Sequence, residues 1–144
     1  MTSKKERFEL MNRLLRTYMI NMQHFYISLS PQLDLTPQQA RTLLYIQKKP
    51  GLIQREIGDY FHLRNASVTS MLKNLERAGY IVRKNDQESA RIKRIFLTDA
   101  GVAKTAKIKT VFDQAYSQIV DHLREEDIDA MVTAMKKINR DLEK

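Results

Sequence analysis

Apolar residues recur at alternating steps of three and four along the N-terminal part of the chain. The series runs through Phe8, Met11, Leu15, Tyr18, Met22, Phe25 and Leu29. Such spacing keeps side chains on one stripe of an α-helix, and a sustained heptad pattern is typical of a helix that packs along another helix. The pattern predicts one long helix over residues 5–29, ended by Ser30-Pro31, because proline disfavours the helical conformation of the residue before it.

The C-terminal part of the chain carries a second seam of the same kind. A helix is expected over residues 125–142, with acidic residues suited to its positive N-terminus, and another over about 99–122, capped by Thr98. The two seams could pack on each other within one monomer. Their positions on either side of a compact centre favour a homodimer that shares a helical interface. The residues of the later seam are Ile128, Met131, Met135, Ile138 and Leu142.

Between the seams, the pattern predicts three shorter helices and a β-hairpin. Thr36-Pro37-Gln38-Gln39 has the form of a capping box with proline at the first helical position. Lys49-Pro50-Gly51 ends that helix, and Gly79 ends a later one. The other expected elements are helices over about 53–61 and 65–78 and strands over 80–83 and 91–97.

The helix expected over residues 65–78 has two contrasting faces. On a helical wheel, Val68, Met71, Leu72 and Leu75 fall on one side. The opposite side offers short hydrogen-bonding side chains backed by cations, which suits the base edges and phosphates of the major groove of DNA. An ordinary solvated helix face is the alternative interpretation. The polar side holds Ala66, Ser70, Lys73 and Arg77, with Ser67, Thr69 and Asn74 on its flanks.

The segments on either side of this helix favour the DNA-binding interpretation. A short helix and a tight connection over residues 61–64 precede it, as in a helix-turn-helix. A basic hairpin follows, which can act as a wing with its tip in the minor groove. We therefore predict a mainly α fold with a small β-hairpin. A winged helix-turn-helix DNA-binding region is expected over 36–98, and a helical dimerisation region over 1–35 and 99–144.

The distribution of charge agrees with a polyanionic partner. The chain has a formal net charge of +8, and residues 64–98 hold eight basic and three acidic side chains. Nucleic acid and an anionic membrane surface are the two candidates. Membrane attachment favours a basic amphipathic helix, whereas part of this charge lies on a hairpin, so no membrane partner is expected. The chain contains no cysteine and no long uncharged segment, and a cytoplasmic protein is expected.

The sequence offers little for catalysis or for a cofactor. No Ser/His/Asp set and no phosphate-binding glycine loop is visible, and the acidic residues at 125–127 are explained by a helix N-terminus. His24, His62 and His122 have no second ligand at helical spacing. We therefore expect neither an enzyme nor a bound metal or cofactor.

Several short motifs stand in a specific order and spacing along the chain: Leu35-Thr36-Pro37-Gln38-Gln39, Gln54-Arg55-Glu56-Ile57, Ser67-Val68-Thr69, Leu75-Glu76-Arg77-Ala78-Gly79-Tyr80-Ile81 and Leu97-Thr98-Asp99-Ala100-Gly101. Taken together, they resemble the MarR family of bacterial winged-helix transcription regulators over about residues 10–142. The resemblance implies a homodimer with entwined terminal helices that binds a palindromic operator in double-stranded DNA. It also implies a repressor released by a small aromatic or lipophilic effector.

These inferences assign three sets of candidate residues. Residues expected in or beside the major groove are Arg64, Asn65, Ser67, Thr69, Ser70, Lys73 and Asn74, while Arg77 and Lys93 are expected at phosphates and Arg91 in the minor groove. Residues expected in the dimer interface are Phe8, Met11, Leu15, Ile128, Met131, Met135, Ile138 and Leu142. Tyr18, Met22 and Tyr26 are expected in the effector pocket implied by the family, with core packing as the alternative.

The chain departs from the family pattern at two places. The wing of the family usually has Asp, a variable residue and then Arg, whereas this chain has Ser89-Ala90-Arg91, so that Asp86 or Glu88 would have to supply the carboxylate. The turn between the helices of the motif often has glycine where this chain has His62. The alternative function is a winged helix that binds nucleic acid non-specifically, or binds protein, without control by an effector.

Overall fold

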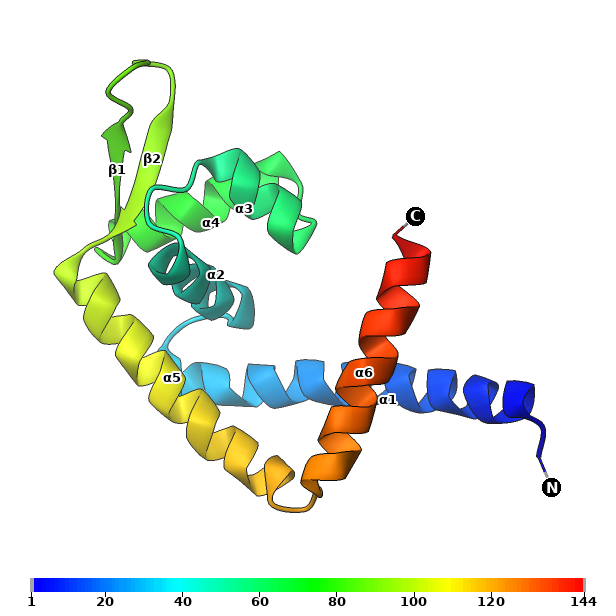
Figure 1. The fold of residues 1–144 in the computed structure, drawn as a ribbon. Coiled ribbons are helices and arrows are strands. Elements are labelled where there is room, and N and C mark those ends of the chain that lie inside the picture. Colours follow the sequence, from blue (N-terminus) through cyan, green and yellow to red (C-terminus); the bar gives the residue numbers. More distant parts are fainter. Residues whose placement is uncertain (1, 144) are drawn as a thin grey trace. The chain divides into compact units, whose positions relative to one another are not determined.

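The computed structural model describes residues 2–143, which form six helices and one two-stranded antiparallel sheet (Figure 1). The order of elements confirms the predicted one. One compact unit runs up to Ile108 and a second begins at Lys109, so the division falls within the helix that precedes the C-terminal one. The elements are α1 (Lys4–Leu33), α2 (Pro37–Lys48), α3 (Gln54–Phe61), α4 (Asn65–Arg77), β1 (Ile81–Asn85), β2 (Lys93–Leu97), α5 (Asp99–Val120) and α6 (Glu125–Leu142).

Helix α1 is longer than predicted, since it passes through Ser30-Pro31 and ends at Leu33. Pro31 lies in the last turn, where the missing N–H removes one helical hydrogen bond without interrupting a continuing helix. Leu29 and Leu33, one turn apart, are both buried, and their burial anchors this last turn of the helix. Asp34 is the C-cap of this helix. It has a left-handed φ of 53° and donates its backbone N–H to Ser30 O over 2.8 Å.

A small apolar core holds α2, α3, α4 and the hairpin together. The helix α2 begins as predicted, because Thr36 Oγ1 accepts from Gln39 N over 3.1 Å and Gln39 Oε1 accepts from Thr36 N over 2.9 Å. Contacts join α3 to α4, α4 to β1 and α2 to β2. The core residues of these elements are Leu43, Ile46, Ile57, Val68, Leu72, Leu75, Ile81 and Ile95, all 2% exposed or less.

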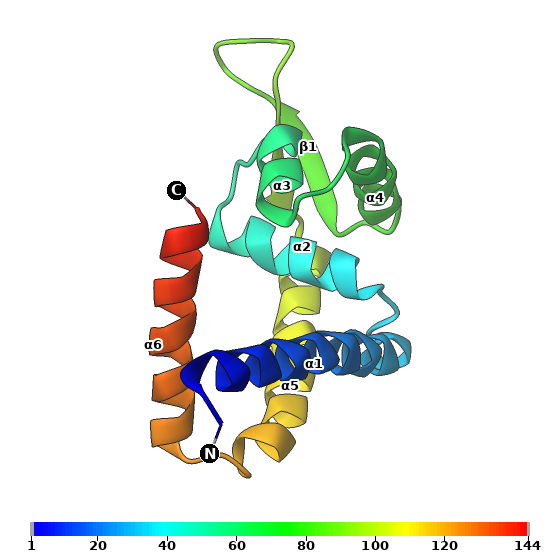
Figure 2. The ribbon, with the colours of Figure 1, turned by 90° about the vertical axis from the view of Figure 1, so that its right-hand side faces the viewer.

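The hairpin is anchored at its base by the connection between α2 and α3. Strand β1 pairs with β2 from Ile81 opposite Leu97 to Asn85 opposite Lys93. Leu52 adds a further rung on the free edge of β2, because Ile95 N donates to Leu52 O over 2.8 Å and Gly51 N donates to Ile95 O over 2.9 Å. Residues 86–92 form the loop that projects beyond α3 and α4 (Figure 2). Arg91 and Ile92 lie in this loop, outside the strand predicted over 91–97.

The junction between the hairpin and α5 depends on a close approach of two backbones. Thr98 caps α5, because its Oγ1 accepts from Gly101 N over 3.0 Å, and its own N–H donates to Tyr80 O over 3.0 Å. A Cβ atom on Gly101 would overlap the carbonyl oxygen of Tyr80. Gly79, with φ +86°, ends α4 as predicted and turns the chain into β1.

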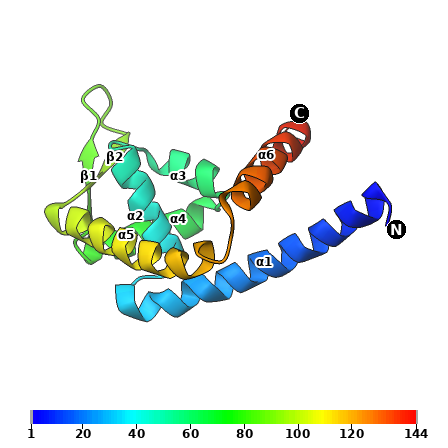
Figure 3. The ribbon, with the colours of Figure 1, turned by 60° about the horizontal axis from the view of Figure 1, so that its bottom comes forward.

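The predicted seams are incompletely buried in the single chain. Leu29 and Leu33 are the only buried residues of α1, and the N-terminal half of this helix extends beyond α2, α3 and α4 (Figure 3). Phe8 is 46% and Tyr18 55% exposed. Helix α6 contains no buried residue between Glu125 and Leu142. None of the helices within residues 2–143 is long and apolar enough to cross a lipid bilayer.

Replacing Gly101 with alanine should destabilise the first unit by about 3 kcal/mol or more, because the new methyl group forces the Tyr80 carbonyl away from α5. Gly58→Ala is the matched control, since its Cβ would lie 3.3 Å from Leu63 O and alanine favours the helix. We expect the control to change the free energy of unfolding by less than about 1 kcal/mol. Urea unfolding followed by circular dichroism measures both, and equal losses would contradict the proposed close approach.

Candidate nucleic-acid interface

Helix α4 buries the face that its sequence predicted and exposes the other. Val68, Met71, Leu72 and Leu75 are all buried, at 9% exposure or less. On the opposite side, Ala66, Ser70, Lys73 and Arg77 are exposed, as are Ser67 and Asn74 on the flanks. Thr69 is half-buried, since it faces α3. The first unit therefore holds α4 by its apolar side and presents a continuous polar side to solvent.

The turn between α3 and α4 keeps the conformation that glycine would favour. His62 has a left-handed φ of 56°, and Leu63 N donates to Gly58 O over 2.9 Å. This conformation is unfavourable by roughly 1–2 kcal/mol for a residue with a Cβ atom. The departure from glycine at this position thus leaves the tight turn of the helix-turn-helix in place, and Arg64 follows as the N-cap of α4.

A polar network joins the first turn of α3 to the first two turns of α4. Gln54 Nε2 lies 2.9 Å from Asn65 Oδ1 and 2.7 Å from Thr69 Oγ1. Thr69 Oγ1 in turn donates to Asn65 O over 2.9 Å. Two residues expected at the major groove are therefore held by a residue of the preceding helix.

The basic residues of the wing fall into two groups. Arg83 and Arg94 are partly buried and paired, with Arg83 Nε 3.5 Å from Glu76 Oε2 and Arg94 Nε 2.7 Å from Asp86 Oδ1. Lys84 Nζ lies 5.4 Å from the ring centroid of Phe96. Arg91 and Lys93 are exposed, and neither forms an ion pair within residues 2–143. Arg83 and Arg94 thus stabilise the hairpin itself, whereas Arg91 and Lys93 are available to a partner.

The Asp86 carboxylate does not take the place of the missing wing carboxylate. It accepts from Arg94, and Arg94 Nη1 also donates to Gly51 O over 3.0 Å. Arg94 therefore ties the end of the loop to the connection between α2 and α3. The backbone N of Arg91 lies 3.4 Å from Ser89 Oγ, and no carboxylate in the part of the chain that the structure describes pairs with the Arg91 guanidinium.

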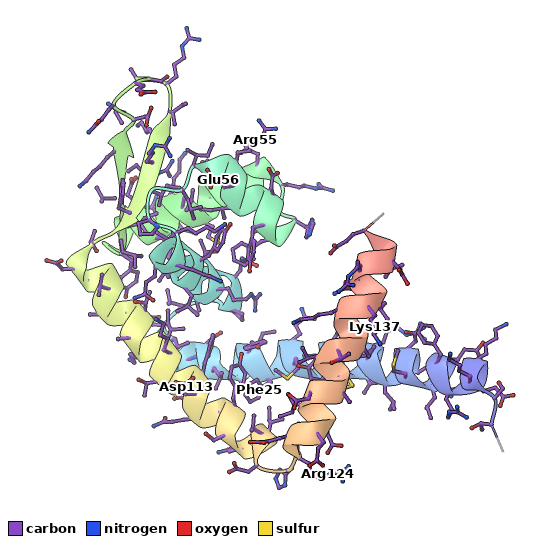
Figure 4. The ribbon with its side chains drawn as sticks, in the orientation of Figure 1. Phe25, Arg55, Glu56, Asp113, Arg124 and Lys137 are labelled. Carbon is purple, nitrogen blue, oxygen red and sulfur yellow. The ribbon has the colours of Figure 1, made fainter. Side chains whose placement is uncertain are left out.

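A cationic cleft of about 340 Å³ lies between the start of α3 and the wing. Its lining brings the predicted Arg91 and Lys93 together with Gln54, Arg55 and Arg83. Arg55 projects outward from α3 (Figure 4), and its Nε lies 3.9 Å from the carboxylate of Asp59, with both side chains largely exposed. Gln54 and Arg55 are not among the predicted site residues, since nothing in the spacing of the sequence reveals that the α3 N-terminus lies beside the wing.

The three residues proposed for an effector also come together. Tyr18, Met22 and Tyr26 line a cleft of about 540 Å³ between α1 and the start of α2, with Met19, Gln23, Ile27, Thr36, Pro37, Gln38 and Arg41. The Arg41 guanidinium carbon lies 5.5 Å from the ring centroid of Tyr26. Within residues 2–143, no three histidine, aspartate or glutamate side chains gather closely enough to hold a metal ion.

The arrangement of α2, α3, α4 and the hairpin is that of a winged helix-turn-helix protein. The sequence profile of the MarR family matches residues 33–92. An uncharacterised HTH-type transcriptional regulator of Bacillus cereus is 32% identical over 114 residues, which cover 77% of this chain and 74% of that relative. The chain belongs to the MarR family.

Other relatives are more distant or matched over a shorter part. The transcriptional regulator SarZ of Staphylococcus haemolyticus is 25% identical over 73% of this chain and 70% of its own length. TtmR of Methylorubrum extorquens is 38% identical over 53% of this chain, and the match spans only 39% of TtmR.

Solved structures of the family share the fold. The structure of Staphylococcus aureus MepR in complex with DNA has a TM-score of 0.79 and 28% identity, and the match covers 90% of this chain and 96% of MepR. The regulator SP03579 has a TM-score of 0.88 over 96% of this chain and 92% of its own, at 18% identity, and shows likeness of fold alone.

The ion pair between Asp86 and Arg94 predicts acid-sensitive anchoring of the wing. The hydrogen bond from the Arg94 guanidinium holds the pKa of Asp86 below its ordinary value of 3.8. The pair therefore stabilises the folded state fully well above pH 3.8, and this contribution is lost as the pH falls below 3.8. Asp86→Asn should be less stable than the unmodified chain at pH 7, and the difference in unfolding free energy should shrink in acid.

Denaturant unfolding at a series of pH values measures this difference. Glu88→Gln is the matched control, since it removes a carboxylate from the same loop that accepts no side-chain hydrogen bond in the described part of the chain. A gap between the Asp86→Asn variant and the unmodified chain that stays constant down to strong acid would refute the pairing.

Proposed function

We propose that this protein is a sequence-specific, double-stranded DNA-binding transcription regulator that acts as a homodimeric, ligand-responsive repressor on a palindromic operator. The observation that carries the proposal is the exposed side of α4, which presents small polar residues and Lys73, together with the wing cations Arg91 and Lys93, which are exposed and form no ion pair within residues 2–143. Membership of a family in which MepR has been solved in complex with DNA supports it further.

In the proposed complex, α4 enters the major groove and the wing lies along the adjacent backbone. The N-terminal residues of a recognition helix contact base edges in such a motif. Arg64, Asn65, Ser67 and Ser70 occupy that end of α4 and are all exposed. Lys73 and Asn74 follow one turn later, and Arg77 Nη1 donates to Asn74 Oδ1 over 3.3 Å in the free protein. Thr69 acts through its neighbours, because its hydroxyl is already hydrogen-bonded.

The wing supplies contacts that depend on charge more than on sequence. Arg91 is assigned to the minor groove, whose negative potential attracts arginine. Lys93 and Arg77 are assigned to phosphates, and Arg55 joins them because it lines the same cleft as Arg91. The net charge of +8 favours association with DNA over a long range.

The homodimer is supported by apolar surface that a single chain leaves uncovered. A helix of 30 residues that buries only Leu29 and Leu33 needs a partner for the rest of its apolar stripe. Phe8, Met11 and Leu15 provide this stripe in α1. In α6 it consists of Ile128, Met131, Met135, Ile138 and Leu142, none of which is buried. Assigning these surfaces to a second copy, and residues 1–35 and 99–144 to dimerisation, remains part of the proposal.

The effector is proposed to bind the cleft of Tyr18, Met22 and Tyr26. Aromatic rings and a flexible methionine suit a flat apolar ligand. Arg41 beside the Tyr26 ring favours an aromatic ligand that carries negative charge. Binding there would change affinity for the operator only to the extent that the ligand prefers one conformation of the protein over another.

Removing single cations should separate specific from non-specific contacts with DNA. Lys73→Ala and Arg91→Ala should each weaken binding to a selected operator by about 1–3 kcal/mol. Lys93→Ala should weaken binding to all sequences alike and lower the slope of log K against log salt by about one. Fluorescence anisotropy with labelled duplexes at several salt concentrations measures both effects. Lys107→Ala on α5 controls for the loss of one positive charge, and equal affinity of all four variants would reject the interface.

A charge placed in either seam should dissociate the dimer and reduce affinity for DNA at the same time. Leu15→Lys and Met135→Lys bring a solvated ammonium into an apolar contact, which is strongly unfavourable. Analytical ultracentrifugation reports the mass, and anisotropy reports binding to a two-half-site operator. Asn12→Lys, on an exposed position of α1 outside the seam, should leave both unchanged. A monomeric seam variant with full operator affinity would contradict the proposed dimer.

A further inference from the structure

Gln54, the first residue of α3, is placed to control how α4 presents its own side chains. Its amide nitrogen lies within hydrogen-bonding distance of three oxygen atoms: Thr69 Oγ1 at 2.7 Å, Asn65 Oδ1 at 2.9 Å and the backbone carbonyl of Asn65 at 3.4 Å. Gln54 and Thr69 are half-buried, whereas Asn65 is exposed. The network therefore links Gln54, a half-buried residue of α3, to Asn65, an exposed residue of α4.

The hydrogen-bonding chemistry fixes the orientation of both amides. The Thr69 hydroxyl gives its one hydrogen to the backbone carbonyl of Asn65 over 2.9 Å, so it can only accept from Gln54, and the end of Gln54 that faces it must be the donor, the NH₂ group. One hydrogen of the Gln54 amide is therefore directed at Thr69 Oγ1 over 2.7 Å, and the backbone carbonyl of Asn65, at 3.4 Å, receives no hydrogen of its own from Gln54. The remaining hydrogen of the Gln54 amide then requires an acceptor at Asn65, which is the side-chain oxygen.

This orientation has a consequence for the surface that α4 presents. Since Asn65 Oδ1 is directed at Gln54, both hydrogens of the Asn65 amide are left without a protein partner among residues 2–143. Thr69 has no donor left, because its one hydrogen is used within α4. At this end of α4, Asn65 therefore offers hydrogen-bond donors, and the acceptor half of its amide is occupied.

We propose that Gln54 is a positioning residue that sets the base preference of Asn65. The inference rests on the proposed function, since it assumes that α4 reads base edges. With its amide held in this way, Asn65 prefers bases whose major-groove edge presents only acceptors, which are guanine (N7 and O6) and thymine (O4), over adenine, whose N7 acceptor lies beside the N6 donor. The bidentate pairing of asparagine with adenine, which uses donor and acceptor together, is disfavoured.

The network suggests a substitution that reverses the preference without touching the reading residue. A glutamate at position 54 can only accept, so Gln54→Glu should turn the Asn65 amide round and direct its NH₂ group at the new carboxylate. Asn65 Oδ1 then faces outward and favours base edges that donate, which are cytosine N4 and adenine N6. Gln54→Ala removes the constraint, and Asn65 should then discriminate less between the two kinds of edge.

The experiment is in vitro selection from a randomised duplex library with the full chain, followed by affinity measurements on the selected duplexes. Wild type should enrich a motif with guanine or thymine at the position read by Asn65. Gln54→Glu should prefer cytosine or adenine there, with a roughly five- to tenfold change in relative affinity, the low end of the range for one wrong base pair. Gln118→Glu, which makes the same change of charge on an exposed position of α5, should leave the motif unchanged.

A second pair of variants tests whether the effect passes through Asn65. In the Asn65→Ala background, Gln54→Glu should no longer change base preference. A shift that persists there would mean that residue 54 contacts the base itself, which overturns the positioning role. Unchanged motifs for Gln54→Glu and Gln54→Ala would overturn the inference alone. A wild-type chain that enriches no sequence would overturn the proposed sequence-specific function, and this inference with it.

Discussion

The packing of one side of α4 is the interaction on which the rest of the structure depends. Val68, Leu72 and Leu75 are almost completely excluded from solvent, together with the apolar residues of α2, α3 and the hairpin. Burying a side chain of this size contributes roughly 1.5–3 kcal/mol, so the loss of any one of the three would remove a large fraction of the small net stability of a domain. Because the helix is held from one side only, its other side is free to present polar groups, and the chemistry of the surface can vary without loss of the fold.

Much of this architecture follows from local patterns in the sequence. The two faces of α4, the capping box of α2 and the glycine stop at Gly79 each rest on residues close together in the chain, and the structure confirms all three. The bounds of α6 agree as well, because its acidic first turn and its regular seam give two independent signals. The assignment of these surfaces to DNA, to a second copy and to an effector depends on partners, and a single chain contains no direct information about them.

The features that were missed depend on tertiary contacts. Pro31 predicts that α1 ends at residue 29, yet the helix continues to Leu33, because Leu29 and Leu33 are both buried. Asp86 and Glu88 were equal candidates for a partner of Arg91, and only the pairing of the two strands reveals that Asp86 faces Arg94. Gln54 and Arg55 join the site because the N-terminus of α3 lies beside the wing, an adjacency that no spacing in the sequence encodes. In the sequence, Gln54 and Arg55 are ordinary residues in the first turn of a helix. Their position beside the wing appears only when the chain is folded.

The anchoring of the hairpin has a mechanical consequence. Its base is joined to the connection between α2 and α3 by the rung between Leu52 and Ile95 and by the contact of Arg94 with Gly51, which resist movement of the strands relative to these helices. Bending is then expected in residues 87–91, because Asp86 is still held by Arg94 and donates its backbone N–H to Ile92 O over 2.9 Å. In the proposed complex with DNA, a groove that is narrower or wider than average would be accommodated by bending of this short segment, while α4 keeps its angle of approach. The stiffness of the loop, set by its composition, would therefore decide how much variation in duplex shape the protein tolerates.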